Sequence, residues 1–414
     1  MNILISAYSC EPGISSKLGI NWHIIREIAN YHQVWVLTRL GKSWEAIETE
    51  LARNPIPNLH FVSVTLPFWQ DIQRQQTKEM QLHYYLWQIQ VYFVARRLHQ
   101  KIGFDLIHDV SFGNYFNPSF LSLMPLPLVW GPIGSGESAP ASFWQDFSLR
   151  AKIYEIVRST KGWLKERDPF LHLTTKRSAV IRATTKNIAE RLYKLGASQV
   201  QVIPESGLSE EDIARLAKYE IPDGQTIKFI SIGRLQHWQG FHLGLRAFAQ
   251  ANLPNAEYWI VGEGEELKRL QILAQDLQVA HKVKFWGKLS REKTLDLLRD
   301  CHVLVHPRLH SSGGWECIEA MAAGRPVLCL NLGEPAIQVT NETGIKIPAN
   351  EPYQAVRDLA AAMLQLAKEP ELKIKMGQAG QARVSQHYSW KVMGKQLNQL
   401  YTGIVHQANT QKSL

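Results

Sequence analysis

The stretch HVLVHPRLHSSGGWECIEAMAAGRPVLCLN, residues 302–331, decides the fold of this chain. It begins with the apolar run HVLVHP, which is typical of a strand buried on both faces. A loop with paired glycines follows, and then ECIEAMAAG, a helical pattern that ends at Gly324 as a C-terminal cap. PVLCLN is a second apolar strand. Strand, helix and strand in this order predict two parallel strands joined by a crossover helix.

The same alternation extends over most of the chain, and it restarts once. Apolar runs typical of buried strands occur in the first half at 3–7, 34–38, 59–64, 104–110, 126–134, 179–185 and 199–207. They recur in the second half at 226–233, 256–261, 282–287 and 302–307. Helical patterns between the strands of the second half lie at 241–251, 265–277 and 290–301, and we expect Ser290 to be the N-cap of the last one. Two successive runs predict two α/β domains with parallel sheets, and we expect the boundary between residues 204 and 220.

Composition excludes several classes of protein. The chain has 414 residues, 45% of them hydrophobic and 20% charged, which is typical of globular proteins. Its four cysteines form no C-x-x-C pair, so the sequence indicates neither a disulfide scaffold nor a zinc site and fits a cytoplasmic protein. The longest uncharged stretch, 110–136, contains four prolines and cannot form a spanning helix.

The net charge of +9 suits an anionic substrate or an anionic membrane surface. No sequence signature supports nucleic-acid binding, so we expect no nucleic-acid partner. Contact with the inner face of a membrane stays open. One segment bears on this question. It is the aromatic helical pattern at 82–100, within a longer helical stretch at 71–101, for which a core helix is favoured over a membrane-interface or lipid-acceptor helix.

Residues 311–319 form the strongest candidate site. Ser311, Ser312, Gly313 and Gly314 lead directly into a helix, whose exposed N–H groups can bind a phosphate. Glu319 follows one to two turns later, where its carboxylate could accept hydrogen bonds from two vicinal hydroxyls of a ribose. The alternative, in which Ser312 only caps the helix and Glu319 faces solvent, remains open.

The segment SIGRLQHWQG, residues 231–240, is a second candidate. Gly233 ends a strand and Arg234 follows at the carboxyl end, where ligands bind in open α/β sheets and an arginine can clamp a diphosphate. A surface arginine on a loop is the alternative. Gly262, in VGEGEE, follows the next strand, but a G-x-G pattern alone indicates only a tight turn.

Three segments of the first half follow predicted strands. The first is the loop at 10–22, which contains Gly19, and the second places His108 at the end of the strand FDLIHDV. His108 could touch a substrate hydroxyl or be a structural histidine bonded to a backbone carbonyl. The third, GPIGSGE at 131–137, could line an acceptor pocket or simply turn.

Together these segments resemble the retaining, nucleotide-sugar-dependent glycosyltransferases of family 4. The resemblance rests on G-R-L at 233–235, V-G-x-G at 261–264, F-x-G at 285–287, H-P at 306–307 and E-A-M-A-A-G-x-P-V at 319–327. It implies the α/β fold called GT-B, in which two Rossmann-like domains face each other across a cleft. The expected domains are an acceptor domain over 1–205, a donor domain over 206–385 and a C-terminal helix at 386–414 that crosses back to the first domain.

The resemblance also implies roles for individual residues. Arg234 would bind the donor diphosphate, Glu319 would hold the ribose hydroxyls, and both count with His108 as the catalytic residues. The implied donor-binding residues are Gly233, Gln239, Gly262, Gly287, Leu289, Ser311, Ser312, Gly313, Gly314 and Trp315. The implied acceptor-side residues are Gly19, Asn21, Gly131, Gly134 and Glu137. No metal or other cofactor is implied, because arginine and a helix N-terminus would stabilise the leaving diphosphate.

Three positions depart from the family pattern. Ser311 stands where the family has the first glutamate of a pair, Gln239 where it has a phosphate-binding lysine, and Val110 where it often has a histidine. Losing one cationic contact would cost a few kcal/mol of transition-state stabilisation. His237 could replace it in part, and Lys17 could restore charge nearby.

The predicted function is therefore transfer of a hexosyl unit from a nucleoside diphosphate sugar to an acceptor hydroxyl with retention of configuration. The acceptor would be a polysaccharide, a lipid-linked sugar or a small metabolite. The first alternative is a catalytically impaired homologue that binds a nucleotide sugar or a partner protein. The second is epimerisation of a nucleotide sugar, which needs no acceptor.

Overall fold

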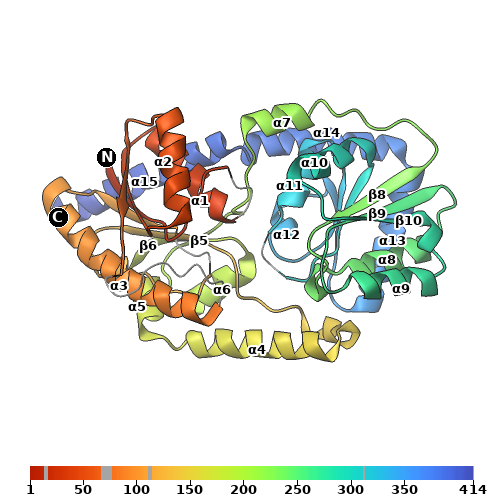
Figure 1. The fold of residues 1–414 in the computed structure, drawn as a ribbon, viewed down its shortest axis with the longest axis horizontal. Coiled ribbons are helices and arrows are strands. Elements are labelled where there is room, and N and C mark those ends of the chain that lie inside the picture. Colours follow the sequence, from red (N-terminus) through yellow and green to blue (C-terminus); the bar gives the residue numbers. More distant parts are fainter. Residues whose placement is uncertain (14–16, 67–76, 111–113, 311–312, 414) are drawn as a thin grey trace. The chain divides into compact units, whose positions relative to one another are not determined.

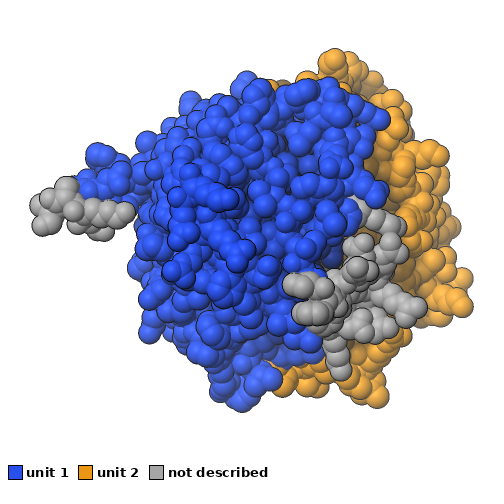
Figure 2. Space-filling model, turned by 60° about the vertical axis from the view of Figure 1, so that its left-hand side comes forward, with its two compact units in different colours: residues 1–136, 161–205, 390–414 blue, residues 137–160, 206–389 orange. Residues whose placement is uncertain are grey.

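Two parallel β-sheets, one in each of two compact units, form the framework of this chain (Figure 1). The structure is a computed structural model that describes residues 1–13, 17–66, 77–110, 114–310 and 313–413. Unit 1 consists of residues 1–136, 161–205 and 390–414, and unit 2 of residues 137–160 and 206–389 (Figure 2). Residues 137–160 thus group with unit 2, whereas the expected acceptor domain, 1–205, includes them.

The sheet of unit 1 has seven strands in the order β3-β2-β1-β4-β5-β6-β7, all parallel. The strands are β1 (Asn2–Ser6), β2 (Gln33–Thr38), β3 (Leu59–Ser63), β4 (Leu106–Asp109), β5 (Leu128–Ile133), β6 (Ser178–Ala183) and β7 (Val200–Val202). The helices of the unit are α1 (Lys17–Ala29), α2 (Lys42–Arg53), α3 (Thr77–Ile102), η1 (Phe120–Leu123), α5 (Pro169–Arg177), α6 (Lys186–Lys194) and α15 (Trp390–Ser413).

The sheet of unit 2 has six strands in the order β10-β9-β8-β11-β12-β13, again all parallel. The strands are β8 (Ile227–Ile232), β9 (Ala256–Val261), β10 (Val283–Gly287), β11 (Val303–His306), β12 (Val327–Leu330) and β13 (Gly344–Ile347). The helices are η2 (Ala141–Asp146), α7 (Glu210–Leu216), η3 (His237–Gln239), α8 (Phe241–Ala251), α9 (Leu267–Asp276), η4 (Ala280–Lys282), α10 (Arg291–Asp300), α11 (Trp315–Ala322), α12 (Pro335–Gln338), α13 (Pro352–Lys368) and α14 (Pro370–His387). One further helix, α4 (Leu149–Lys165), begins in unit 2 and ends in residues of unit 1.

Near-continuous apolar strands are explained by burial on both faces of the sheet in unit 2. Successive residues of β8 point in opposite directions, so Phe229 packs with α8 and α13 while Ile230 packs with α10 and α11. In β9, Tyr258 likewise packs on the same face as Phe229, and Trp259 packs on the same face as Ile230. Both faces are therefore covered by helices, as expected for parallel sheets joined by crossovers.

Each sheet reverses its strand order at one point, between β1 and β4 in unit 1 and between β8 and β11 in unit 2. In open α/β sheets, ligands bind outside the carboxyl ends of the strands at such a point. The predicted α/β class with two parallel sheets is confirmed. The order of the strands in each sheet could not be predicted from the sequence, because pairing between strands that are far apart in the chain leaves no local sequence pattern.

The aromatic helix α3 is a core helix, which confirms the favoured interpretation of residues 82–100. Tyr84, Trp87, Val91 and Ala95 are buried at helical spacing, and the indole of Trp87 donates to the Val64 carbonyl at 3.1 Å. Residues 71–76 of the longer predicted stretch lie outside the described residues.

The C-terminal helix α15 is an integral part of unit 1. Trp390 stacks on His23 of α1 at 4.7 Å between ring centroids. Further along α15, the hydroxyl of Tyr401 hydrogen-bonds Nδ1 of His108, whose Nε2 lies 2.6 Å from the Gly131 carbonyl oxygen. Because a carbonyl only accepts, Nε2 carries the proton and Tyr401 donates to Nδ1. Burial lowers the pKa of His108 to about 3, in keeping with a neutral ring.

We predict that Tyr401→Phe destabilises the protein by about 1–3 kcal/mol, because it leaves a buried imidazole nitrogen without its donor. Denaturant unfolding monitored by circular dichroism measures the change. Thr402→Val is the matched control, since this exposed neighbour bonds only its own helix, through the Asn398 carbonyl. Equal unfolding free energies for Tyr401→Phe and the unmodified protein would contradict the assigned anchor.

Candidate functional site

The carboxyl ends of β8, β9 and β10 are joined through glycine backbone. The amide of Gly262 donates to the Gly287 carbonyl at 2.8 Å, and the amide of Gly233 donates to the Val261 carbonyl at 3.0 Å. A Cβ on Gly262 would lie 1.8 Å from the carbonyl oxygen of Gly233, and Gly262 has a φ of +141°. Only glycine fits here, so these three predicted donor-binding residues lie together at one edge of the sheet.

Arg234 and Gln239 lie beside these glycines. Arg234 lies just after β8 and is exposed, and its guanidinium has no hydrogen-bond or ion-pair partner among the described residues. The amide of Gln239, in contrast, is buried and would lie 3.2 Å from a Cβ on Gly233. The residue that replaces the family's lysine therefore sits next to the strand end, while Arg234 supplies an available positive charge.

Glu319 is a buried carboxyl group in α11 that faces a cation. Its Oε1 accepts from Arg291 at 3.1 Å, and Arg291 also pairs with Asp212 of α7 at 3.0 Å. Burial raises the pKa of Glu319 to about 7, and the Arg291 charge opposes this rise. No donor among the described residues hydrogen-bonds the other carboxylate oxygen, Oε2. The solvent-facing alternative for Glu319 is therefore wrong.

The N-terminus of α11 is built around two glycines. Gly313, with a φ of +93°, packs against the guanidinium of Arg308 and donates its amide to Oε1 of Glu334 at 3.2 Å. Gly314 precedes the first helical residue, and a Cβ there would lie 2.1 Å from Oε1 of the buried Gln338. Both polar atoms of the Gln338 side chain are buried without a hydrogen-bond partner among the described residues.

The other predicted donor-binding residues fall near this helix or near α10. The indole of Trp315 donates to the Gly207 carbonyl at 2.9 Å. Leu289 is half-buried in the core beneath α10, next to Ser290, whose hydroxyl caps that helix as predicted by accepting from Lys293. Ser311 and Ser312 lie outside the described residues.

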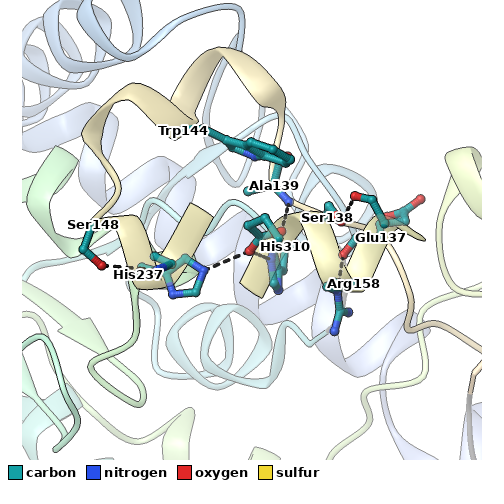
Figure 3. Close-up of polar contacts among 11 residues, drawn as sticks. Glu137, Ser138, Ala139, Trp144, Ser148, Arg158, His237 and His310 are labelled. Atoms are coloured by element: carbon teal, nitrogen blue, oxygen red, sulfur yellow. Dashed lines mark hydrogen bonds and ion pairs between the residues drawn. The ribbon is translucent and has the colours of Figure 1, made fainter. Parts of the chain in front are cut away.

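A buried carboxylate, Glu155 of α4, connects the two candidate loops of unit 2. Figure 3 labels two of its partners, His237 and His310. Oε1 of Glu155 lies 2.9 Å from Nε2 of His237 and 2.8 Å from Nε2 of His310, and Oε2 of Glu155 accepts from the Ala139 amide at 3.0 Å. His237 belongs to the segment after Arg234, and His310 directly precedes the serines and glycines before α11. The described residues contain no group of three His, Cys, Asp or Glu side chains placed to hold a metal ion.

Electrostatics explains how this carboxylate tolerates burial. Hydrogen bonds from the two histidines and an amide outweigh desolvation and lower the pKa of Glu155 to about 2. Burial lowers the pKa of His310 to about 4, so its ring is neutral at pH 7 and donates from Nε2. Trp238 stacks on His310 with ring centroids 4.9 Å apart, which fixes the position of the imidazole.

The predicted acceptor-side residues mostly have local structural partners. In unit 1, Gly19 is buried in α1, Asn21 donates to the Ser9 carbonyl at 2.7 Å, and Gly134 packs against Thr184. Gly131, as described, accepts from His108. Glu137 begins unit 2, and its carbonyl accepts from Arg158 at 2.8 Å.

His108 is fully buried with both ring nitrogens hydrogen-bonded inside unit 1. The structural alternative accounts for this residue, so His108 takes no part in the site proposed below.

Several residues of the site were missed by sequence reasoning. Arg291, Glu334 and Glu155 are charged side chains in loops or helices, where a charge most often faces solvent. Arg291 offered a weak signal, since it directly follows Ser290, the expected cap of the helix predicted at 290–301. Glu155 offered none, because its partners are 82 and 155 residues away in the chain.

The family model described as glycosyl transferases group 1 matches residues 213–383. The matched region covers most of unit 2.

Curated relatives match parts of the chain. A D-inositol 3-phosphate glycosyltransferase of Corynebacterium jeikeium is 28% identical over 180 residues, which cover 41% of this chain and 42% of that protein. A GDP-mannose-dependent monoacylated alpha-(1-6)-phosphatidylinositol monomannoside mannosyltransferase of Corynebacterium glutamicum is 30% identical over 36% of this chain and 39% of its own length. The chain thus spans about two fifths of these two relatives.

Solved structures match the whole chain. HepE of Anabaena in complex with UDP aligns with a TM-score of 0.60 and 18% identity, covering 97% of this chain and 100% of HepE. Sucrose-phosphate synthase of Thermosynechococcus elongatus aligns with a TM-score of 0.64 and 18% identity, covering 98% and 100%. At this identity the likeness shows the fold, which is GT-B.

We predict that Glu155→Gln destabilises the protein by about 1–3 kcal/mol, because an amide cannot accept from all three donors that now converge on the carboxylate. Thermal and denaturant unfolding measure the change, which should be the same from pH 8 to pH 5. The depressed pKa of Glu155 explains this constancy: its stabilising charge is lost only as the pH falls toward about 2.

Glu263→Gln is the control for this variant, since Glu263 is an exposed carboxylate that pairs with Lys288 at 3.2 Å. This control substitution should lower the free energy of unfolding by less than about 1 kcal/mol. Equal effects of the two substitutions would mean that the histidine cluster adds nothing to stability.

Proposed function

We propose that this protein is a glycosyltransferase that uses a nucleoside diphosphate sugar and binds it at the carboxyl edge of the sheet in unit 2. The observation that carries the proposal is the convergence at this edge of an unpartnered arginine, three glycine backbones and a buried carboxylate that follows a glycine-rich helix start. The group 1 family match over 213–383 supports the same assignment. UDP is the first nucleotide to test, because HepE was solved with UDP.

The diphosphate would be held by Arg234 and by the N-terminus of α11. An unpartnered guanidinium supplies two parallel hydrogen bonds to phosphate oxygens, and a helix N-terminus stabilises negative charge. Arg308, whose guanidinium packs against Gly313, would supply a second positive charge and thus offset the loss of the family's lysine at Gln239. The proposed mechanism needs no metal ion, since these groups stabilise the leaving diphosphate.

The ribose would be bound by Glu319. Arg291 occupies Oε1 and fixes the carboxylate, so Oε2 is free to accept from the vicinal hydroxyls. Asp212 holds Arg291 from its other side at 3.0 Å, which makes Arg291 a positioning residue.

The proposed reaction retains the configuration of the sugar. The acceptor hydroxyl attacks the anomeric carbon from the face that the diphosphate leaves. The bond from carbon to the phosphate oxygen breaks, the new carbon–oxygen bond forms, and the leaving phosphate oxygen takes the proton of the acceptor. No protein nucleophile is needed. The proton NMR coupling of the anomeric hydrogen in the product distinguishes retention from inversion.

We predict that the protein is stabilised by UDP or another nucleoside diphosphate without added metal, by about 2.7 kcal/mol at a hundredfold excess over Kd. Arg234→Ala should weaken this binding by about tenfold to a hundredfold, the loss expected for a charge-assisted hydrogen bond. Arg308→Met should act in the same direction. Arg357→Ala removes an exposed arginine from α13 as a matched control and should leave Kd unchanged. Unchanged binding by Arg234→Ala would contradict the site.

We also predict that the affinity for the nucleotide sugar falls about tenfold from pH 8 to pH 6, because only the ionised carboxylate accepts from both ribose hydroxyls. The midpoint should lie near the pKa of Glu319, about 7. Calorimetric titration with the intact nucleotide sugar measures this, since its diphosphate diester does not titrate in the range. In Glu319→Gln the dependence should disappear, whereas Glu292→Gln, an exposed change on α10, should preserve it. A pH profile that survives in Glu319→Gln would rule out the ribose role.

A further inference from the structure

Helix α4 has two faces of opposite character. Ala151, Glu155 and Gly162 are buried, and at about 100° per residue they lie on one side of the helix. The opposite side is apolar and exposed. We name it the α4 apolar face, and it consists of Leu149, Ile153, Ile156, Val157, Trp163 and Leu164.

This exposure is concentrated on one element. Of the seventeen large hydrophobic side chains that are exposed among the described residues, seven lie on α4, including Tyr154 beside the apolar face. Leu149 is 75% exposed and Leu164 is 63% exposed at the two ends of the helix. Scattered exposed apolar residues are normal in a soluble protein, but a contiguous row of this kind marks an interaction surface.

The row is narrow and has basic borders. At about 100° per residue, the six side chains of the α4 apolar face fall within an arc of about 120° on the side away from the buried face, and the exposed Thr160 is a polar residue within this arc. Arg150 and Lys161 border this arc on one side, and Lys152 borders it on the other. Lys152 and Lys161 have no ion-pair partner in the part of the chain that the structure describes.

Negative charge is nearly absent from the helix. Glu155 is buried and hydrogen-bonded to two histidines, and Glu166, just beyond the helix, pairs with Arg191. Arg150 makes only a long contact of 3.9 Å with Glu265, and its side chain is 89% exposed. Next to the end of the helix, the guanidinium of Arg167 lies 3.4 Å from the centre of the Trp163 ring.

We propose that the α4 apolar face binds the surface of an anionic lipid membrane. An apolar stripe opposite the docked face, bordered by lysine and arginine and containing a tryptophan, matches a helix that lies in the membrane interface. Its basic borders would meet anionic headgroups while Ile153, Ile156 and Leu164 enter the acyl boundary. Within the described residues, no helix is long and apolar enough to cross a membrane.

Charge favours a lipid surface over a second copy of this chain. Pairing two copies through α4 would bring together four to six like-charged side chains at the borders of the contact, which is unfavourable. An anionic membrane would instead attract these side chains, and each lysine or arginine near the surface contributes about 1 kcal/mol to the binding free energy. The inference concerns α4 alone and does not rest on the proposed function.

Vesicle co-sedimentation with the full chain tests the proposal. The protein should bind vesicles of phosphatidylcholine with one-third phosphatidylglycerol, and bind vesicles of phosphatidylcholine alone at least about tenfold more weakly, because three basic side chains face the headgroups. The double variant Ile153→Glu/Ile156→Glu should lose about tenfold or more in affinity for the anionic vesicles, since two side chains no longer enter the apolar layer.

Ile272→Glu/Ile374→Glu is the matched control. These isoleucines are also exposed, at 56% and 44%, against 52% for both Ile153 and Ile156, but they lie on α9 and α14. The control should bind vesicles as the unmodified protein does. Both double variants should keep the melting temperature of the unmodified protein within about 2 °C, because all four side chains are already in water.

Three results would overturn the proposal. The first is no binding of the unmodified protein to anionic vesicles. The second is equal binding by Ile153→Glu/Ile156→Glu and the unmodified protein. The third is a dimer in light scattering that only Ile153→Glu/Ile156→Glu converts to a monomer, without vesicle binding, which would assign the face to a second copy of the chain.

Discussion

The close approach of glycine backbones at the ends of β8 and β9 is the constraint on which the candidate site depends. A side chain on Gly262 would collide with the Gly233 carbonyl, so these strand ends can meet only as bare backbone. This contact sets where Arg234 leaves the sheet. It also keeps the edge free of side chains where the proposed diphosphate would bind.

Carboxylates hold the loops around that edge, and two of them, Glu155 and Glu334, are fully buried. Glu155 connects the segment after Arg234 to the segment before α11, Glu334 accepts from the Gly313 amide, and Asp212 positions Arg291 against Glu319. Such groups contribute to stability only when their hydrogen bonds are complete, and removing a partner leaves an uncompensated charge. The chain therefore fixes the site through a few buried charges, which makes it rigid and sensitive to single substitutions.

Much of this could be predicted from the sequence. The alternation of apolar strands and helices predicted the two parallel sheets. The rule that ligands bind at the carboxyl ends of strands singled out Gly233 and Arg234, whereas Gly262 was assigned only through the family resemblance. Local caps such as Ser290 were also correct. These features are encoded within a few residues of one another, so a pattern along the chain is enough to find them.

Other features could not be found in this way. The contacts of Glu155 depend on packing between segments that are far apart in the chain, and the sequence around it shows an ordinary amphipathic helix. His108 had two open interpretations, and only the position of Tyr401, 293 residues later, decides for the structural one. Residues 137–160 group with unit 2 although they precede much of unit 1, an arrangement that no local signal indicates.

A crystal structure of the protein with a bound nucleoside diphosphate tests the central claim most directly. The account predicts phosphate oxygens within hydrogen-bond distance of the Arg234 guanidinium and the ribose hydroxyls on Oε2 of Glu319, with Arg291 still on Oε1. A nucleotide bound elsewhere, or one whose ribose leaves Glu319 without contact, would contradict it.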